Sequence, residues 1–225
     1  DVYNETKHTN IFVENSSKNG GAIYHSTNNY LFYVNGASFT KNTASLNGGA
    51  IYNNGYMVVN NIKFDSNVAK GDGGAIYNTG KNDRSGIYNS LFVNNSAVNC
   101  GAVYTNTGKV NYQLTIQQVK FGQYDEVNKT TSDGNIASGN GGALYVTDDA
   151  QVELVNVDFK SNTANGNGGA IYANKDVTVS AENGSSTFDG NKANGESNAI
   201  YATSDATVTL NARNNGTINM NDKIS

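Results

Sequence analysis

The chain has 225 residues and a formal net charge of −4, with 37% hydrophobic and only 15% charged residues. Because its pI is near 5.1 and no basic cluster is present, we expect no nucleic-acid partner. No apolar run approaches the roughly 18 residues of a membrane-spanning helix, and Cys100, as the single cysteine, excludes an intrachain disulfide.

A five-residue motif, Gly-Gly-Ala-Ile-Tyr with variants, recurs from one end of the chain to the other. In chain order its copies end at Tyr24, Tyr52, Tyr77, Tyr104, Tyr145, Tyr172 and Tyr201. A second motif, Phe-x-x-Asn, precedes six copies, starting at Phe12, Phe39, Phe64, Phe92, Phe159 and Phe188. The tyrosines are 28, 25, 27, 41, 27 and 29 residues apart. Such self-similarity is typical of a repeat protein, here with a period of about 27 residues.

Each unit contains short segments with an apolar spacing of two, which predicts strands. In the unit that ends at Tyr172, these are residues 152–154, 157–159 and 170–172. Three short strands with three bends use up about 27 residues, which is one coil of a β-helix. The chain also has no proline, as suits central strands that need every N–H group. We expect an all-β, right-handed, single-stranded parallel β-helix of about seven to eight rungs, forming a single domain over residues 1–225.

The long interval between the fourth and fifth copies predicts an insertion. Aligning 135–137 with 67–69 places about eleven extra residues in a loop at about residues 122–134. Loops that project from a solenoid often bind ligands, although a tolerated surface loop is an equal alternative. The candidate binding residues in this loop are Tyr124, Asp125 and Glu126.

Stacked rungs predict ladders of like residues along the β-helix. The phenylalanines, with Phe121, should form one core ladder, and the aliphatic residues before each tyrosine should form another. Seven asparagines should stack at a bend, where Asn tolerates left-handed backbone and can pass amide hydrogen bonds between rungs. These are Asn15, Asn42, Asn67, Asn95, Asn135, Asn162 and Asn191.

The direction of the tyrosines follows from the alternation of side chains along a strand. If the aliphatic residue points inward, its neighbours Ala and Tyr point outward. The opposite parity would bury a column of hydroxyl groups, each of which would need a partner. We therefore expect an exposed ladder of seven tyrosines, and we take all seven as candidate binding residues.

The paired motifs resemble those of the chlamydial polymorphic outer-membrane proteins and related type V autotransporter adhesins, over nearly the whole chain. Three departures stand out: Cys100 replaces the first Gly of one copy, residues 197–198 replace both in the last, and Phe121 lacks the following Asn. The resemblance implies a fragment of a longer β-helical passenger, displayed on the bacterial cell surface and held to the outer membrane by a C-terminal barrel outside these residues. It also implies a role in attachment to host cells and virulence.

The sequence offers little for catalysis. Polysaccharide lyases and glycoside hydrolases on this fold need clustered carboxylates, yet among the residues that follow the ladder phenylalanines, no two adjacent rungs carry an acid. His8 and His25 have no cysteine or acid at metal-ligand spacing. We therefore expect no enzyme, no catalytic residue, no cofactor and no metal.

The favoured hypothesis is an adhesin segment that binds a host surface protein or glycan through a lateral face of the β-helix. Self-association is a further option. A passive β-helical stalk is an alternative, and a polysaccharide lyase or glycoside hydrolase is a less favoured one.

Overall fold

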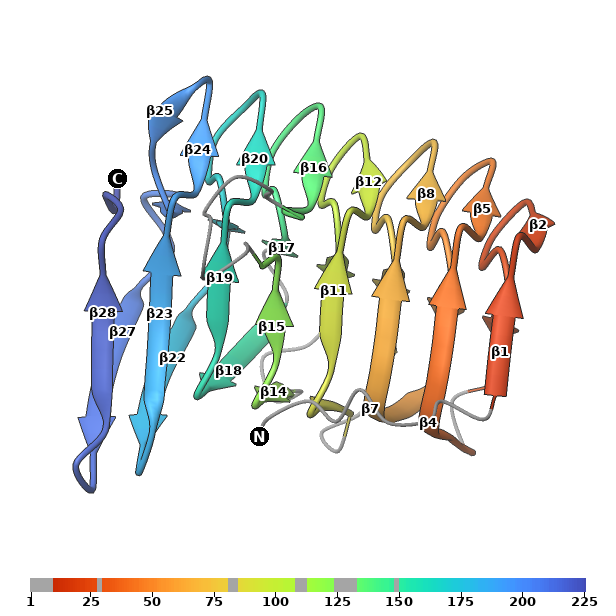
Figure 1. Cartoon of the computed structure of the whole chain (residues 1–225), viewed down its shortest axis with the longest axis horizontal. Coiled ribbons are helices and arrows are strands. Elements are labelled where there is room, and N and C mark those ends of the chain that lie inside the picture. The colour runs from red at the N-terminus through yellow and green to blue at the C-terminus, as the bar shows by residue number, and fades with distance from the viewer. Residues whose placement is uncertain (1–9, 28–29, 81–84, 108–112, 124–132, 148–149) are drawn as a thin grey trace.

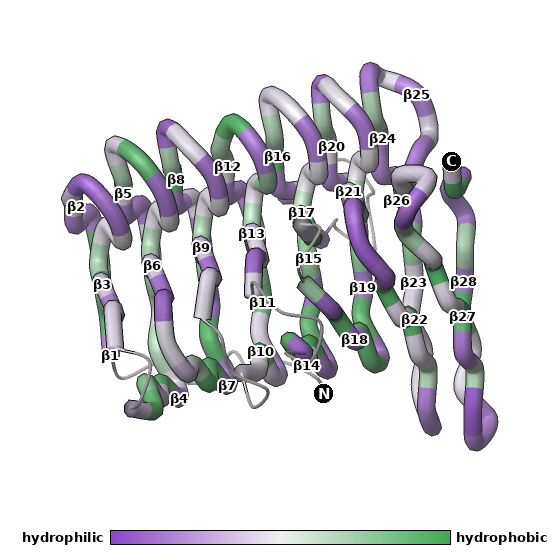
Figure 2. Tube along the Cα trace, turned by 180° about the vertical axis from the view of Figure 1, so that it is seen from behind, coloured by the Kyte–Doolittle hydropathy of each residue, from purple (hydrophilic) through white to green (hydrophobic). Residues whose placement is uncertain are grey.

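The computed structural model describes residues 10–27, 30–80, 85–107, 113–123, 133–147 and 150–225. Within these ranges the chain forms strands and no helix, and the strands stack as a β-helix of about seven rungs (Figure 1). From β1 the chain rises on the near side of Figure 1, crosses the top through β2 and descends on the far side, where Figure 2 shows β3. It advances towards the C-terminal end as it turns, so the coil is right-handed. The β-helix expected from the sequence is confirmed.

The first sheet has 13 strands and bends so that it covers two sides of the β-helix. The long strands β4 and β7 run over both sides, whereas each later rung has one strand on each side. The strands are β1 (Asn10–Val13), β4 (Leu31–Thr40), β7 (Tyr56–Asp65), β10 (Gly86–Tyr88), β11 (Leu91–Val93), β14 (Gln113–Gln117), β15 (Lys120–Phe121), β18 (Gln151–Val155), β19 (Asp158–Lys160), β22 (Val177–Glu182), β23 (Ser185–Asp189), β27 (Val208–Arg213) and β28 (Thr217–Met220).

The second sheet consists of eight two-residue strands. They are β2 (Ser16–Ser17), β5 (Thr43–Ala44), β8 (Val68–Ala69), β12 (Ser96–Ala97), β16 (Ile136–Ala137), β20 (Thr163–Ala164), β24 (Lys192–Ala193) and β25 (Glu196–Ser197). Each of the first seven follows an Asn of the Phe-x-x-Asn position. Each rung thus has a short strand in addition to the three segments expected from the sequence. This strand was not predicted because two residues are too few to show an alternating pattern.

The third sheet has seven strands, which carry the tyrosine motif. They are β3 (Ile23–His25), β6 (Ile51–Asn53), β9 (Ile76–Asn78), β13 (Val103–Thr105), β17 (Leu144–Val146), β21 (Ile171–Ala173) and β26 (Ile200–Ala202). Paired strands are parallel, with the exception of the antiparallel pair β24–β25. Like residues lie opposite one another, as Tyr77 and Tyr104 do between β9 and β13.

The core is a column of phenylalanines beside a column of aliphatic residues. From Phe39 to Phe188 the rings are fully buried, and each stacks on the next at 4.5–5.1 Å between centroids, starting from the partly buried Phe12. The aliphatic column is fully buried from Ile51 to Ile200. Both predicted core ladders are confirmed.

The asparagine ladder is also confirmed, and its buried amides are fully hydrogen-bonded. The left-handed backbone expected at these asparagines is wrong, because it lies one residue earlier, as at Lys41, Ser66 and Asn94. At each of six steps, Nδ2 of one Asn donates to Oδ1 of the Asn in the next rung at 2.9 Å. The second Nδ2 hydrogen donates to a phenylalanine carbonyl of the preceding rung at 2.8–3.0 Å from Asn42 onwards. At the C-terminal end Asp222 takes the acceptor role, with its Oδ2 2.8 Å from Asn191 Nδ2. Six of the asparagines have no exposed surface, so these bonds are needed to offset the cost of burial.

The ladder also fixes where the insertion lies. Asn135 accepts from Asn95 and donates to Asn162, and Ile136 lies opposite Ser96, which pairs with Val68 on its other side. The alignment of 135–137 with 67–69 is therefore confirmed. The stem of the loop is tied by the Asp133 N–H, which donates to the Gln123 carbonyl at 2.8 Å.

The two glycines of each motif have different roles. Gly48 has φ = +67°, a conformation that favours glycine, and Cys100 adopts the same one, with φ = +63°. Gly49 is needed for space, because a Cβ there would lie 2.0 Å from the Gly74 carbonyl oxygen of the next rung. The first slot holds Cys100 in one rung at the same φ, and the second holds a side chain only in the last copy, where Asn198 replaces the glycine.

The alanine of the motif does not face solvent, so the outward direction expected for it is wrong. Ala50, Ala75, Ala102, Ala143, Ala170 and Ala199 are fully buried and belong to the hydrophobic core. The alanine lies in the bend before the strand, which begins one residue later. Strict alternation does not apply there.

Candidate functional site

The tyrosine ladder runs along the outside of the third sheet, over all seven of its strands. Tyr52 lies between the fully buried Ile51 and Asn53, so it points away from the core. The next four copies repeat this arrangement. Tyr24, in the first rung, is 59% exposed. The outward direction predicted for the tyrosines is therefore confirmed.

The tyrosine rings stack on one another along the rod. Neighbouring centroids are 4.7–5.3 Å apart and the ring planes differ by 7–31°. The faces of the inner rings are thus covered by the rings of adjacent rungs. What the ladder presents to solvent is a row of ring edges and hydroxyl groups, repeated at the rung spacing.

Burial against neighbouring rungs makes these phenols harder to ionise. Desolvation raises the pKa of Tyr77, and the neighbouring Tyr52 and Asp72 add to the effect. The pKa of Tyr104 is raised further, again mainly by desolvation and then by Tyr77. These hydroxyls are neutral near pH 7, so they can both donate and accept hydrogen bonds.

A second polar column runs beside the tyrosine ladder, five residues earlier in each rung. We call it the outer amide ladder; it consists of Asn19, Asn47, Asp72, Asn99, Asn140 and Asn167. In the first five members, a side-chain oxygen accepts a hydrogen bond from the next rung, such as the Asp72 N–H to Asn47 Oδ1 at 2.9 Å and Asn99 Nδ2 to Asp72 Oδ1 at 3.0 Å. Together the two columns form a lateral face rich in uncharged polar groups, with Asp72 as the acid of the ladder.

A buried polar ladder lies on the inner side of the same sheet. The His25 ring and Asn53 Oδ1 are 2.7 Å apart, Asn53 donates to Asn78 at 2.7 Å, and Asn78 donates to Thr105 at 3.4 Å. In the next rungs the equivalent residues are Val146 and Ala173, which are buried and apolar. This ladder was not predicted from the sequence, although the parity that turns the tyrosines outward also turns the residue after each of them inward.

The loop residues predicted as binding candidates, Tyr124, Asp125 and Glu126, lie outside the described residues. Their role stays a prediction.

Groups suited to catalysis or metal binding are sparse in the part of the chain that the structure describes. No three His, Cys, Asp or Glu side chains come together there. Cys100 is fully buried, its Sγ donates to the Ala143 carbonyl at 3.0 Å, and burial raises its pKa well above the usual range, so the thiol is protonated. Also within the described ranges, no helix is long and apolar enough to span a membrane.

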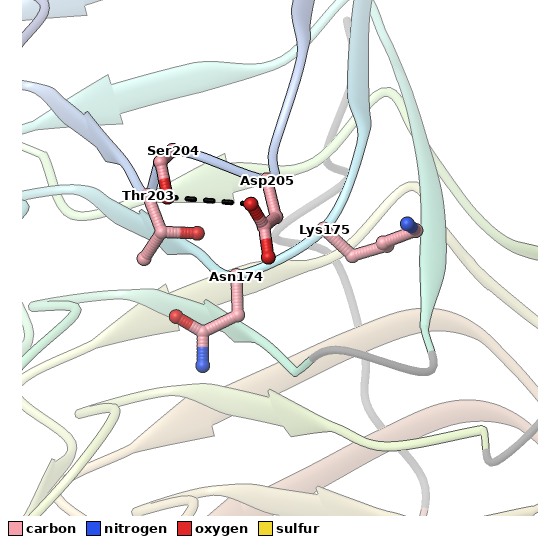
Figure 3. Close-up of a pocket in the computed structure, with 5 residues that line it drawn as sticks. All are labelled: Asn174, Lys175, Thr203, Ser204 and Asp205. Carbon is pink, nitrogen blue, oxygen red and sulfur yellow. Dashed lines mark hydrogen bonds between the residues drawn. The ribbon is translucent and has the colours of Figure 1, made fainter.

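A shallow hollow of about 370 Å³ lies between the loops that follow β21 and β26 (Figure 3). Its lining residues are Asn174, Lys175, Thr203, Ser204 and Asp205. Ser204 Oγ donates to Asp205 at 3.3 Å, and Asp205 is the single carboxylate of the lining. This hollow lacks the pair of carboxylates that glycoside hydrolysis requires.

These features define the class of the protein: a right-handed parallel β-helix whose rungs repeat one sequence motif and whose like residues form continuous ladders. The family model of the Chlamydia polymorphic membrane protein repeat matches the chain five times, at residues 11–26, 36–54, 61–79, 129–147 and 156–174. The chain therefore carries five copies of the Chlamydia polymorphic membrane protein repeat, which confirms the resemblance to the chlamydial family. The copies outside these matches are those in which Cys100 or residues 197–198 replace the glycines. No curated protein and no solved structure matches the chain.

The repeat family and the fold together suggest a surface-exposed, adhesin-like β-helical protein with a structural, non-enzymatic role.

Proposed function

We propose that this chain is a surface-displayed attachment segment, which binds a host surface protein or glycan through the face formed by the tyrosine ladder and the outer amide ladder. The observation that carries the proposal is the unbroken row of seven outward tyrosines in register. The core does not require this row, because the inward residues of the same strands already fill the interior. Tyrosine is enriched at protein interfaces, where it supplies large contact area and a polar tip.

Binding of the purified 225-residue chain to cultured epithelial cells tests this proposal. The variant Tyr77→Phe/Tyr104→Phe keeps the ring stack and removes two hydroxyls, and Tyr77→Ala/Tyr104→Ala removes the rings as well. A matched control is Thr178→Ala/Thr209→Ala, a pair on adjacent rungs of the first sheet. We expect both tyrosine variants to bind more weakly, the alanine variant most, and the control to bind as the wild type does.

A variant without residues 124–132 tests the insertion separately. If attachment survives this deletion and both tyrosine changes, the site lies elsewhere. If the wild-type chain binds no cell, the stalk hypothesis is favoured instead. Depolymerisation of a polysaccharide by the wild-type chain would favour the enzyme hypothesis.

A further inference from the structure

The tyrosine ladder brings phenol rings that are far apart in the sequence into direct contact. Tyr77 and Tyr104 lie opposite each other on β9 and β13, with their ring centroids 4.8 Å apart and their ring planes 7° from parallel. Tyr24 and Tyr52 stack in the same way, at 5.0 Å and 16°. These centroid distances are close to the spacing of the strands themselves, about 4.8 Å, so the rings are hardly offset. Each Cε carbon, ortho to the hydroxyl, therefore faces its counterpart in the next rung.

The hydroxyl ends of these rings are accessible from solvent. Tyr24 is 59% exposed, and the other six tyrosines of the ladder keep part of their surface exposed. After desolvation, which is the main cause, the nearby phenols of Tyr77 and Tyr145 contribute to the raised pKa of Tyr104, so the hydroxyl ends of adjacent rings lie close together. A small oxidant can therefore reach two neighbouring phenols without opening the fold.

Few other side chains compete with tyrosine for a one-electron oxidant. The chain has no tryptophan. Cys100 and Met57 have no exposed surface, and Met220, the second methionine, is partly buried. A buried, protonated thiol is unreactive. Oxidation of the folded chain is therefore directed mainly at its tyrosines.

The tyrosines of the first sheet provide a comparison. Tyr33, Tyr56 and Tyr88 lie on β4, β7 and β10 and are not part of the repeated motif. Tyr33 is 54% exposed, nearly as much as Tyr24. Within the described ranges, no aromatic ring stacks on any of these three. They are thus open to oxidation but lack the close parallel partner that each ladder tyrosine has.

We propose that adjacent tyrosines of the ladder are a modification site, at which a haem peroxidase with hydrogen peroxide joins neighbouring rungs through dityrosine. Each phenol gives up one electron and its hydroxyl proton, which leaves a phenoxyl radical with unpaired spin on the Cε carbons. A carbon–carbon bond forms between two facing Cε atoms, and the hydrogen on each of these carbons then moves to the oxygen, which restores both phenols. Two tyrosines and one hydrogen peroxide thus give one dityrosine and two waters.

The fixed geometry of the ladder favours this reaction over coupling between separate chains. Two radicals held in contact react as an intramolecular pair, with a high effective concentration, and rings on paired strands cannot diffuse apart. The rings tilt towards each other at their solvent ends to form the bond. A ring that pairs with one neighbour therefore moves away from the other.

The cross-link acts as a covalent staple between rungs. A rung of a solenoid contacts only its neighbours, and a bond between Tyr77 and Tyr104 joins residues 27 positions apart. The single cysteine gives the chain no disulfide of its own. A dityrosine constrains the unfolded chain as a disulfide does, so it stabilises the fold without replacing any core residue. This inference does not rest on the proposed attachment function.

Oxidation of the dilute 225-residue chain with a haem peroxidase and hydrogen peroxide, followed by peptide mapping of the monomer fraction by mass spectrometry, tests the proposal. We expect dityrosine fluorescence and cross-linked peptides that join adjacent ladder positions such as Tyr77 and Tyr104, each two hydrogens lighter than the sum of its parts. The thermal unfolding midpoint of the oxidised monomer should rise by roughly 5–10 °C. A photo-oxidised ruthenium complex with persulfate, which is smaller than the peroxidase, should give the same pairs.

The variant Tyr77→Phe/Tyr145→Phe keeps every ring of the stack but leaves Tyr104 without a phenol on either side. Its cross-links at Tyr104 should fall about tenfold or more. The matched control, Tyr33→Phe/Tyr56→Phe, removes two hydroxyls from the first sheet and should leave the ladder cross-links unchanged. Oxidation in urea, where the register is lost, should abolish the preference for adjacent rungs.

The proposal is overturned if the oxidised monomer contains no dityrosine, if its cross-links join Tyr33 or other tyrosines outside the ladder instead, or if the control loses ladder cross-links as the test variant does. Cross-links found only between chains would likewise contradict it. Each of these readouts is independent of cell attachment, so a failure here leaves the proposed function untouched.

Discussion

The phenylalanine and tyrosine ladders have nearly the same stacking geometry and opposite environments. Ring centroids are 4.5–5.1 Å apart in the first and 4.7–5.3 Å apart in the second. The inner phenylalanines have no exposed surface, whereas the tyrosines are partly exposed. The rung spacing sets both ring distances, so stacking alone distinguishes neither a core position nor a binding site. The side of the sheet on which the ring lies makes the difference.

Removing one ring from each ladder gives the largest contrast. Phe92→Ala should lower the free energy of unfolding by about 3–5 kcal/mol, because it leaves a cavity between Phe64 and Phe121 that rigid rungs cannot close. Tyr104→Ala should cost only about 1–2 kcal/mol, since it loses two surface cross-strand contacts. Urea unfolding followed by circular dichroism measures both. Equal losses would mean that the tyrosine ladder is part of the core in energetic terms.

The asparagine ladder beside the phenylalanines should come next in size. Asn95→Ala removes the amide that donates to Asn135 and to the Phe64 carbonyl and that accepts from Asn67, leaving buried partners unsatisfied. We expect a loss of about 2–3 kcal/mol. The exposed Asn219 offers a control, and Asn219→Ala should change stability by less than about 0.5 kcal/mol. A loss in Asn95→Ala no larger than that of the control would contradict this account.

The smallest expected effect is on the pH dependence of stability. It distinguishes the two ladders because tyrosine titrates and phenylalanine does not. The folded pKa of Tyr104 and Tyr77 is raised above the unfolded value of 10.0, so ionisation favours the unfolded chain. The stabilisation is fully present below pH 10 and is lost as the pH rises from there towards the folded pKa. Tyr104→Phe should reduce this fall in the urea midpoint between pH 9 and 11. An identical pH dependence in wild type and variant would show that Tyr104 does not contribute.

Much of the fold could be predicted because a β-helix places residues one period apart on top of each other. Phe92 and Asn95 were assigned to ladders from spacing alone, and the same reasoning placed Asn135 after the insertion. The outward direction expected for Ala50 was wrong because this residue lies in a bend, where the alternation of side chains stops. The buried contacts of His25 and Asn53 were not recognised, because their position holds Val and Ala in other rungs and shows no repeated residue type.

The sequence by itself determined the period, the ladders and the outward tyrosines, because each depends on spacing that repeats in every rung. The tertiary structure alone decided how the rings are presented. In the tyrosine ladder the faces of the inner rings are covered by neighbours, whereas the hydroxyl end of the Tyr88 ring lies over Gly86 of its own strand. That difference depends on the path of a side chain over a neighbouring residue, which no repeat spacing encodes.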